Sequence, residues 1–176
     1  EVFELTTPTA VEPTELVIRF EQGVPVAING QRLGLGALIN QVTAVVGSYG
    51  WGRVDMIENR RVGIKSREVY EVPGALAAIA AHRDLEDLTL DRDVLHEKAR
   101  LDIRYAELVY DGLWFSPLKA ALDAFVAETQ AAVTGEVRLE LSPGRCQPTG
   151  RRAERALYRP DLATYEAGDA FDHDAG

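Results

Sequence analysis

The sequence predicts an α+β fold with a largely antiparallel sheet and helices packed on one side of it. Two patterns predict this fold. Short segments with alternating apolar residues are joined by tight turns, and longer segments carry apolar residues three and four positions apart. Strands joined by tight turns pair antiparallel, and the helical segments are clustered rather than alternating one for one with the strands.

The strand pattern is clearest near the two ends of the chain. Leu16, Ile18 and Phe20 alternate with residues that face away from the core, and the run EQG at 21–23 closes a turn into the next strand. Asn29-Gly30 supplies a second turn. The predicted strands cover residues 16–21, 24–28, 54–57, 62–65 and 137–141, and a last strand starts near Cys146 after the SPG turn at 142–144.

The helical pattern marks four segments. The first begins at Leu35 and ends before Gly50, and the second starts at Pro73-Gly74. Ser116-Pro117 starts the last, because a capping hydroxyl is followed by proline at the first helical position. The predicted helices cover 35–49, 73–83 and 91–110 and a segment from 117 onward, and the inward-facing residues of the last two are Val94, Leu101, Tyr105, Leu108, Leu118, Leu122 and Phe125.

The composition excludes several classes of protein. A net charge of −9 over 176 residues opposes broad binding to nucleic acid. No apolar stretch is long enough to span a bilayer, and no secretion signal is present, so we expect no membrane partner and a cytoplasmic location. The single cysteine, Cys146, suits a reducing compartment. Because the chain begins at Glu1 without methionine, we expect a fragment of a longer protein.

General motifs of catalysis or metal binding are weak. Gly34-Leu35-Gly36 is glycine-rich ahead of a helix, but it has no third glycine at the dinucleotide spacing and no Gly-Lys-Ser/Thr ending, so we interpret it as a helix entrance. Arg145 could lower the pKa of Cys146, although a space-filling thiol is the favoured interpretation.

The histidines give no metal-binding pattern. His82 and His96 lie on predicted helices without a second ligand at helical spacing. His173 between Asp172 and Asp174 is a candidate cluster, but we interpret it as a solvated acidic tail. We therefore expect neither a metal site nor a catalytic residue in this chain.

The segment from residue 55 to residue 70 stands out because two short apolar strands carry many polar side chains. Two interpretations are open: these groups line a cleft, or they form a solvated hairpin whose charges pair with one another. The polar residues are Asp55, Glu58, Asn59, Arg60, Arg61, Lys65, Ser66, Arg67 and Tyr70.

Seven short sequence motifs, which follow one another along nearly the whole chain, resemble those of a known family. They are GVPVAING at 23–30, DMIENR at 55–60, VGIKSR at 62–67, VYEVPG at 69–74, DGLWFSPL at 111–118, VTGEVRL at 133–139 and LY at 157–158. With these runs the chain resembles the C-terminal domain of argininosuccinate synthase. It departs from the commoner motif at Glu68, Val72 and Ala75, where that form has Gly, Thr and Gly. We expect the backbone at Glu68 not to require positive φ.

The resemblance implies a function. This family condenses citrulline and aspartate with ATP, through a citrullyl-adenylate, to give argininosuccinate, AMP and pyrophosphate. It implies that Glu58 and Tyr70 contact citrulline, and that ATP with Mg²⁺ is bound mainly by an N-terminal domain of the same polypeptide. It also implies a homotetramer.

The resemblance also divides the chain. Residues 1–14 would link to the N-terminal nucleotide-binding domain, residues 15–160 would form the synthetase domain, and residues 161–176 would lead to a terminal helix beyond this sequence. The alternative is a non-catalytic binding or oligomerisation module whose polar segment faces another protein. A Ser-Gly-Gly nucleotide loop far upstream in the parent gene would distinguish the two.

Overall fold

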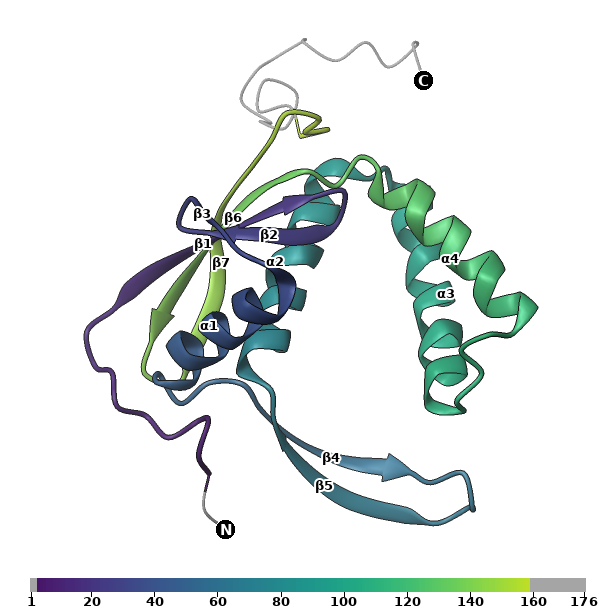
Figure 1. The fold of residues 1–176 in the computed structure, drawn as a ribbon, viewed down its shortest axis with the longest axis horizontal. Coiled ribbons are helices and arrows are strands. Elements are labelled where there is room, and N and C mark those ends of the chain that lie inside the picture. Colours follow the sequence, from purple (N-terminus) through teal and green to yellow (C-terminus); the bar gives the residue numbers. More distant parts are fainter. Residues whose placement is uncertain (1–2, 159–176) are drawn as a thin grey trace, which may run out of the picture.

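The structure is a computed structural model that describes residues 3–158 (Figure 1). Its strands are β1 (Thr14–Glu21), β2 (Val24–Ile28), β3 (Gln31–Arg32), β4 (Arg53–Asn59), β5 (Lys65–Glu71), β6 (Gly135–Ser142) and β7 (Arg145–Ala153). Its helices are α1 (Leu35–Gly47), α2 (Pro73–Thr89), α3 (Arg92–Tyr110) and α4 (Pro117–Gln130).

Five strands form one antiparallel sheet in the order β3-β2-β1-β6-β7. The central pair joins distant parts of the sequence, because β1 and β6 lie side by side with Ile18 opposite Val137. The predicted turn at Asn29-Gly30 is present, and both residues have positive φ.

One face of this sheet is the core of the protein. Ile18, Val137 and Leu139 are fully buried on it, as the alternating pattern predicts. Helices α1 and α2 cover this face and pack against each other (Figure 1), with Leu38 and Ala77 fully buried. The α+β fold with helices on one side of an antiparallel sheet is confirmed.

Two projections extend from this core (Figure 1). The first, here called the arm, is the separate hairpin of β4 and β5. The second, here called the helical hairpin, consists of α3 and α4, which pack on each other. The arm contains most of the polar segment singled out in the sequence.

The second strand of the arm was predicted in the wrong place. Residues 62–65 were expected to form it, whereas β5 runs from Lys65 to Glu71. Residues 61–64 form the turn instead: Gly63 has a φ of 89°, and the Arg60 N–H donates to the Ile64 carbonyl at 2.9 Å. Val62 is 82% exposed. Its β-branched side chain suggested a buried strand, but it lies on the surface of the turn.

Three details of the helices also differ from prediction. Helix α2 extends to Thr89 rather than Arg83, because Leu85 and Leu88 continue its buried face. On α4, Leu122 is buried but Leu118 is 43% exposed, so Leu118 does not belong to the inward face. The start of α3 differs by one residue, since Asp91 is its N-cap and accepts from the N–H groups of Asp93 and Val94.

The segment ahead of β1 has no helix or strand but is anchored to the core. Thr6 is fully buried, and its backbone N–H donates to Glu71 Oε1 at 2.8 Å. The Tyr49 hydroxyl donates to the Glu12 carbonyl at 2.7 Å. This segment is thus attached at Thr6 and Glu12, while the role of residues 1–14 as an interdomain link stays a prediction. The tail at 161–176 lies outside the described residues.

Candidate functional site

Glu58 and Tyr70 lie on the same face of the arm. In β4 and β5 the even-numbered residues share this face, because Val54 lies opposite Tyr70 and Glu58 lies opposite Ser66. The Tyr70 hydroxyl donates a hydrogen bond to Glu58 Oε2 at 2.8 Å. The two residues predicted from the resemblance are thus in direct contact.

The Glu58 carboxylate has two further polar contacts, an ion pair and a hydrogen bond. Arg60 Nη1 lies 3.0 Å from Glu58 Oε1 and the Tyr110 hydroxyl donates to the same oxygen at 3.1 Å. The Tyr70 hydrogen bond is the main cause that lowers the pKa of Glu58, opposed by desolvation and assisted by Tyr110 and Arg60. The Glu58 side chain is therefore ionised at neutral pH, although only 14% of it is exposed.

The end of the helical hairpin contacts the turn of the arm. Tyr110 is the last residue of α3, and its hydroxyl also lies 3.4 Å from the Asn59 carbonyl oxygen. Next to it, Asp111 forms an ion pair with Arg61, which raises the pKa of Arg61. Sequence reasoning missed Tyr110, because nothing local in the sequence indicates which element the end of α3 meets.

The other charges of the arm pair with one another. On the face opposite Glu58, Arg67 makes two hydrogen bonds to Asp55, at 2.8 and 2.5 Å, and this contact lowers the pKa of Asp55. Lys65 donates to the Asn59 side chain. These pairs are those expected of a solvated hairpin, and on the other face Glu58 and Tyr70 bind each other. That the polar groups line a cleft stays a prediction.

A hollow of about 620 Å³ lies beside Tyr70. It is lined by residues 67–71 of β5 together with Phe3 and Leu5 of the N-terminal segment. The Arg53 guanidinium lies over the Phe3 ring, 3.5 Å from its centroid, and holds that ring in place. The N-terminal segment thus contributes a wall next to the candidate site.

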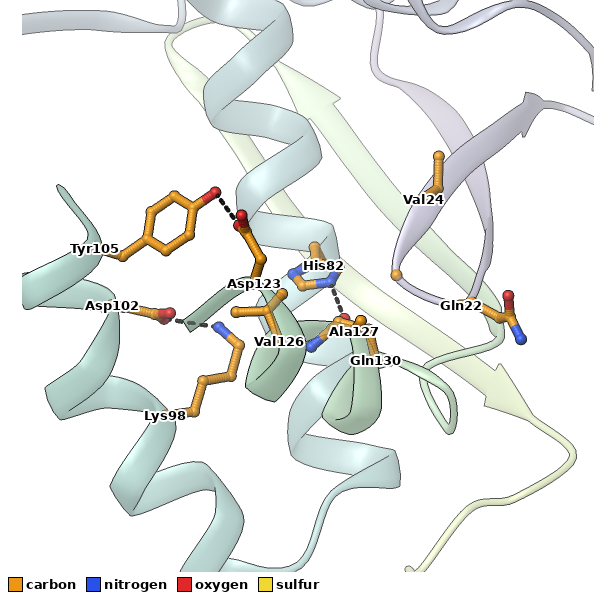
Figure 2. Close-up of a pocket in the computed structure, with 11 residues that line it drawn as sticks. Gln22, Val24, His82, Lys98, Asp102, Tyr105, Asp123, Val126, Ala127 and Gln130 are labelled. Atoms are coloured by element: carbon orange, nitrogen blue, oxygen red, sulfur yellow. Dashed lines mark hydrogen bonds and ion pairs between the residues drawn. The ribbon is translucent and has the colours of Figure 1, made fainter. Parts of the chain in front are cut away.

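A second hollow, of about 590 Å³, lies away from Glu58 and Tyr70, between α2, the helical hairpin and the β1–β2 turn (Figure 2). Its polar side chains bond mainly to one another. His82 Nε2 lies 2.7 Å from Gln130 Oε1, Lys98 binds Asp102 at 2.7 Å, and the Tyr105 hydroxyl donates to Asp123 (Figure 2). Of these, the His82–Gln130 contact attaches the helical hairpin to α2, and the Tyr105–Asp123 contact joins α3 to α4.

The weak motifs of the sequence have structural roles in the described chain. Gly34 is the N-cap of α1, as expected for a helix entrance. Cys146 is buried, and burial raises the pKa of its thiol to about 11, so Arg145 does not activate it. His82 packs against Phe20, with their ring centroids 5.7 Å apart. Residues 172–174 lie outside the described part of the chain.

Two further features are absent from residues 3–158. No group of three or more His, Cys, Asp or Glu side chains in this range is placed to hold a metal ion. No helix in it is long and apolar enough to cross a membrane.

The sequence profile of one protein family, described as "Arginosuccinate synthase C-terminal domain", matches residues 1–176. The chain belongs to this family. Its Glu58–Tyr70 pair is thus a feature of an argininosuccinate synthase C-terminal domain, and the predicted fold family is confirmed.

Curated relatives named "Argininosuccinate synthase" agree with this assignment. Those of Synechococcus sp. (strain JA-2-3B'a(2-13)) and Rubrobacter xylanophilus are 54% and 55% identical over 178 residues, which cover 99% of this chain and 44% of each relative. That of Picosynechococcus sp. is 54% identical, with 45% of its length covered. The chain therefore spans less than half the length of these relatives.

The departure from the commoner family motif at Glu68 has a structural explanation. Glu68 lies within β5, and in the described chain the only non-glycine residues with positive φ are Gln22 and Asn29. The Glu68 carboxylate forms an ion pair with Arg60, the same arginine that contacts Glu58. Glu68 therefore joins the polar face of the site without distorting the strand.

Proposed function

We propose that this chain is the C-terminal part of an argininosuccinate synthase, which condenses citrulline and aspartate with ATP to argininosuccinate, AMP and pyrophosphate. Membership of the family and the names of the relatives support the reaction. The hydrogen-bonded pair of Glu58 and Tyr70 on the arm supports the part taken by this chain, which is to form one wall of the citrulline pocket.

The hydrogen bonds of the pair define what it can recognise. Tyr70 uses its proton to bind Glu58 Oε2, so the phenol oxygen offers lone pairs to a ligand. Within the described residues, Oε2 accepts only this one side-chain hydrogen bond, which leaves it a second acceptor site. Two acceptors 2.8 Å apart fit N–H donors, and citrulline carries such donors on its ammonium and its ureido group. The pair therefore binds a nitrogen end of citrulline and repels its carboxylate.

ATP and aspartate require residues outside this chain. No phosphate loop with a Gly-Lys-Ser/Thr ending occurs in the sequence. In this proposal the rest of the polypeptide holds ATP, its Mg²⁺ and aspartate, and orients the α-phosphate toward the ureido oxygen of citrulline. This chain alone is then inactive as a ligase.

Kinetics of the full-length protein with Glu58→Gln test the citrulline contact. We expect KM for citrulline to rise about tenfold or more, because a hydrogen bond to a charged group is lost, while KM for ATP changes less than twofold. Asp55→Asn is the matched control, since it makes the same chemical change on the opposite face of β4. Equal losses for citrulline and ATP would contradict the proposal.

A second role, in homotetramer assembly, is supported by exposed apolar side chains where the two projections meet. The apolar tip consists of Val62, Ile64, Leu113, Trp114 and Phe115, and the Arg61–Asp111 ion pair joins its two halves. Phe115 is fully exposed and Ile64 is 63% exposed. Such a cluster is typical of a surface covered by another protein, here a second copy of the full-length chain.

Analytical ultracentrifugation of the full-length protein tests the assembly role. Phe115→Ser is expected to shift the protein toward smaller species at micromolar concentration. Val11→Ser, which changes another exposed apolar residue, is the control and should leave the association state unchanged. An unchanged sedimentation coefficient for Phe115→Ser would exclude the apolar tip as a contact between copies.

A further inference from the structure

The carboxylate of Glu58 is held from outside the arm as well as from within it. Tyr70 and Arg60 belong to the arm and its turn, whereas Tyr110 comes from the end of α3, more than fifty positions away along the chain. The Tyr110 hydroxyl donates to Glu58 Oε1 at 3.1 Å. The position of one carboxylate oxygen, Oε1, therefore depends on the position of the end of α3.

The end of α3 is well defined by its own contacts. Leu108 is buried, and the N–H of Leu113 donates to its carbonyl at 2.9 Å. The C-cap residue, Asp111, donates its N–H to the Glu107 carbonyl and binds Arg61 through its side chain, and the N–H of Gly112 donates to the Val109 carbonyl. The helix end thus meets the arm through the Asp111–Arg61 ion pair and through the Tyr110 hydroxyl, which contacts Glu58 and the Asn59 carbonyl.

These contacts divide the two carboxylate oxygens between two tasks. Oε1 accepts a hydrogen bond from Tyr110 and forms an ion pair with Arg60, so this oxygen is held by two protein groups. Oε2 accepts from Tyr70 and keeps one acceptor site. A carboxylate fixed at Oε1 cannot rotate about its terminal bond without losing the Tyr110 hydrogen bond, so Oε2 stays beside the Tyr70 hydroxyl.

We propose that Tyr110 is a positioning residue for citrulline binding: by holding Glu58 Oε1 it keeps Oε2 and the Tyr70 hydroxyl oriented together toward an N–H group of the substrate. This inference rests on the proposed citrulline contact of Glu58. Tyr110 acts through Glu58, and its ring, which is half exposed, needs no contact with citrulline.

A purely structural role for Tyr110 makes different predictions. If Tyr110 only tied α3 to the arm, its removal would resemble the loss of the neighbouring Asp111–Arg61 ion pair, which joins the same two elements without touching Glu58. Asp111→Asn is therefore the matched control. Tyr110→Phe removes the hydroxyl and keeps the ring, so it removes the hydrogen bond to Glu58 and the longer contact with the Asn59 carbonyl, and leaves the rest of the side chain in place.

The test is steady-state kinetics of the full-length protein with Tyr110→Phe, Asp111→Asn, Glu58→Gln and the double variant Tyr110→Phe/Glu58→Gln. For Tyr110→Phe we expect KM for citrulline to rise about five- to tenfold, with KM for ATP and aspartate within twofold of the unchanged protein. Asp111→Asn should change KM for citrulline less than twofold. In the Glu58→Gln background, Tyr110→Phe should have little further effect, because the two residues act as one unit.

A pH profile gives an independent readout. Tyr110 donates to the ionised form of Glu58, so its loss raises the pKa of Glu58. The acid limb of kcat/KM for citrulline should then move to higher pH in Tyr110→Phe and stay in place in Asp111→Asn. The charged and titratable groups around the Glu58 carboxylate are Arg60, Glu68, Tyr70 and Tyr110. All four are retained in the control variant Asp111→Asn.

The outcomes separate this inference from the proposed function. If Glu58→Gln raises KM for citrulline but Tyr110→Phe does not, Tyr110 is not a positioning residue and the citrulline contact stands. If Tyr110→Phe impairs all three substrates equally and lowers the melting temperature as much as Asp111→Asn, its role is structural and the inference is overturned. If Glu58→Gln leaves KM for citrulline unchanged, the proposed contact and this inference both fail.

Discussion

Tyr70 donates its hydroxyl proton to Glu58 Oε2 across the arm, at 2.8 Å. The same hydrogen bond raises the pKa of Tyr70 and lowers that of Glu58, because it stabilises the protonated phenol and the ionised carboxylate together. The two side chains therefore act as one unit, with a fixed donor and a fixed acceptor.

The first prediction concerns the pH dependence of this unit in Tyr70→Phe. The pKa of Glu58 is depressed in the folded protein, so the carboxylate is ionised above that pKa and loses its charge as the pH falls through it. Without the Tyr70 hydrogen bond, the pKa rises toward its ordinary value. The acid-side loss of citrulline kcat/KM in the full-length protein should begin at higher pH in Tyr70→Phe. An acid limb at the same pH as in the unchanged protein would show that Tyr70 does not stabilise the Glu58 carboxylate.

The second prediction concerns the anchor of the N-terminal segment. The Glu71 carboxylate accepts hydrogen bonds from the Thr6 hydroxyl and from the backbone N–H groups of residues 4, 5 and 6, and these contacts lower its pKa from 4.5 to about 2. The contribution to stability is complete above about pH 4.5 and is lost as the pH falls toward 2. In Glu71→Gln it is lost at every pH.

Hydrogen exchange measures this anchor directly. At neutral pH the amides of residues 4–6 should exchange faster in Glu71→Gln, because they lose a charged acceptor. Glu15→Gln, at an exposed glutamate on β1, should leave their exchange unchanged. Equal exchange rates for these amides in Glu71→Gln and in the unchanged chain would mean that Glu71 does not hold the segment.

The third prediction concerns the backbone where the arm joins the core. Gly52 has a φ of 104°, and a Cβ placed there would lie 2.2 Å from the Cα of Pro73. Gly52→Ala should therefore lower the free energy of unfolding of this chain by about 2 kcal/mol or more. The matched control is Gly63→Ala, because Gly63 has a φ of 89° but nothing within 4 Å of its Cβ position. This variant should lower the free energy of unfolding by about 1 kcal/mol, from backbone strain alone. Urea unfolding distinguishes the two, and equal costs would contradict the close approach of Gly52 to Pro73.

The fourth prediction concerns the attachment of the helical hairpin. Gln130 is buried and donates from Nε2 to the buried Glu86 carboxylate at 2.6 Å. Gln130→Leu removes this donor, so it should lower the free energy of unfolding by about 1–3 kcal/mol. Glu128→Ala, at an exposed position of the same helix, should change it by less than about 0.5 kcal/mol. A neutral Gln130→Leu in urea unfolding would show that the contact contributes nothing to stability.

Elements with strong periodicity were predicted closely from the sequence. The alternation of Leu16, Ile18 and Phe20 and that of Val137, Leu139 and Leu141 identified β1 and β6, because one face of each strand is fully buried. The capping residue Ser116 and the proline that follows it marked the start of α4. In these segments local chemistry and tertiary burial favour the same structure.

Where residues 61–64 form a turn, local pattern misled the prediction. Val62 and Ile64 have strand-forming side chains, yet Gly63 and the Arg60–Ile64 hydrogen bond close the turn, and both apolar residues are exposed. Their exposure instead supports the proposed contact between copies of the full-length chain. Predicting a strand from its apolar residues assumes that they are buried, and the prediction fails where such residues lie on the surface.

The site was only partly accessible from the sequence. The resemblance supplied Glu58 and Tyr70, but no periodicity indicates that Tyr110 at the end of α3 meets the turn of the arm. Such a contact depends on how the helical hairpin is oriented relative to the core. That orientation is determined by side-chain bonds such as Gln130 to Glu86, which join residues far apart in the chain.

The most direct test is a crystal structure of the full-length protein with citrulline bound. We expect a nitrogen atom of citrulline within about 3.2 Å of Glu58 Oε2 and of the Tyr70 hydroxyl, with Glu58 Oε1 still bonded to Tyr110. Citrulline bound elsewhere, or with its carboxylate facing Glu58, would contradict the account.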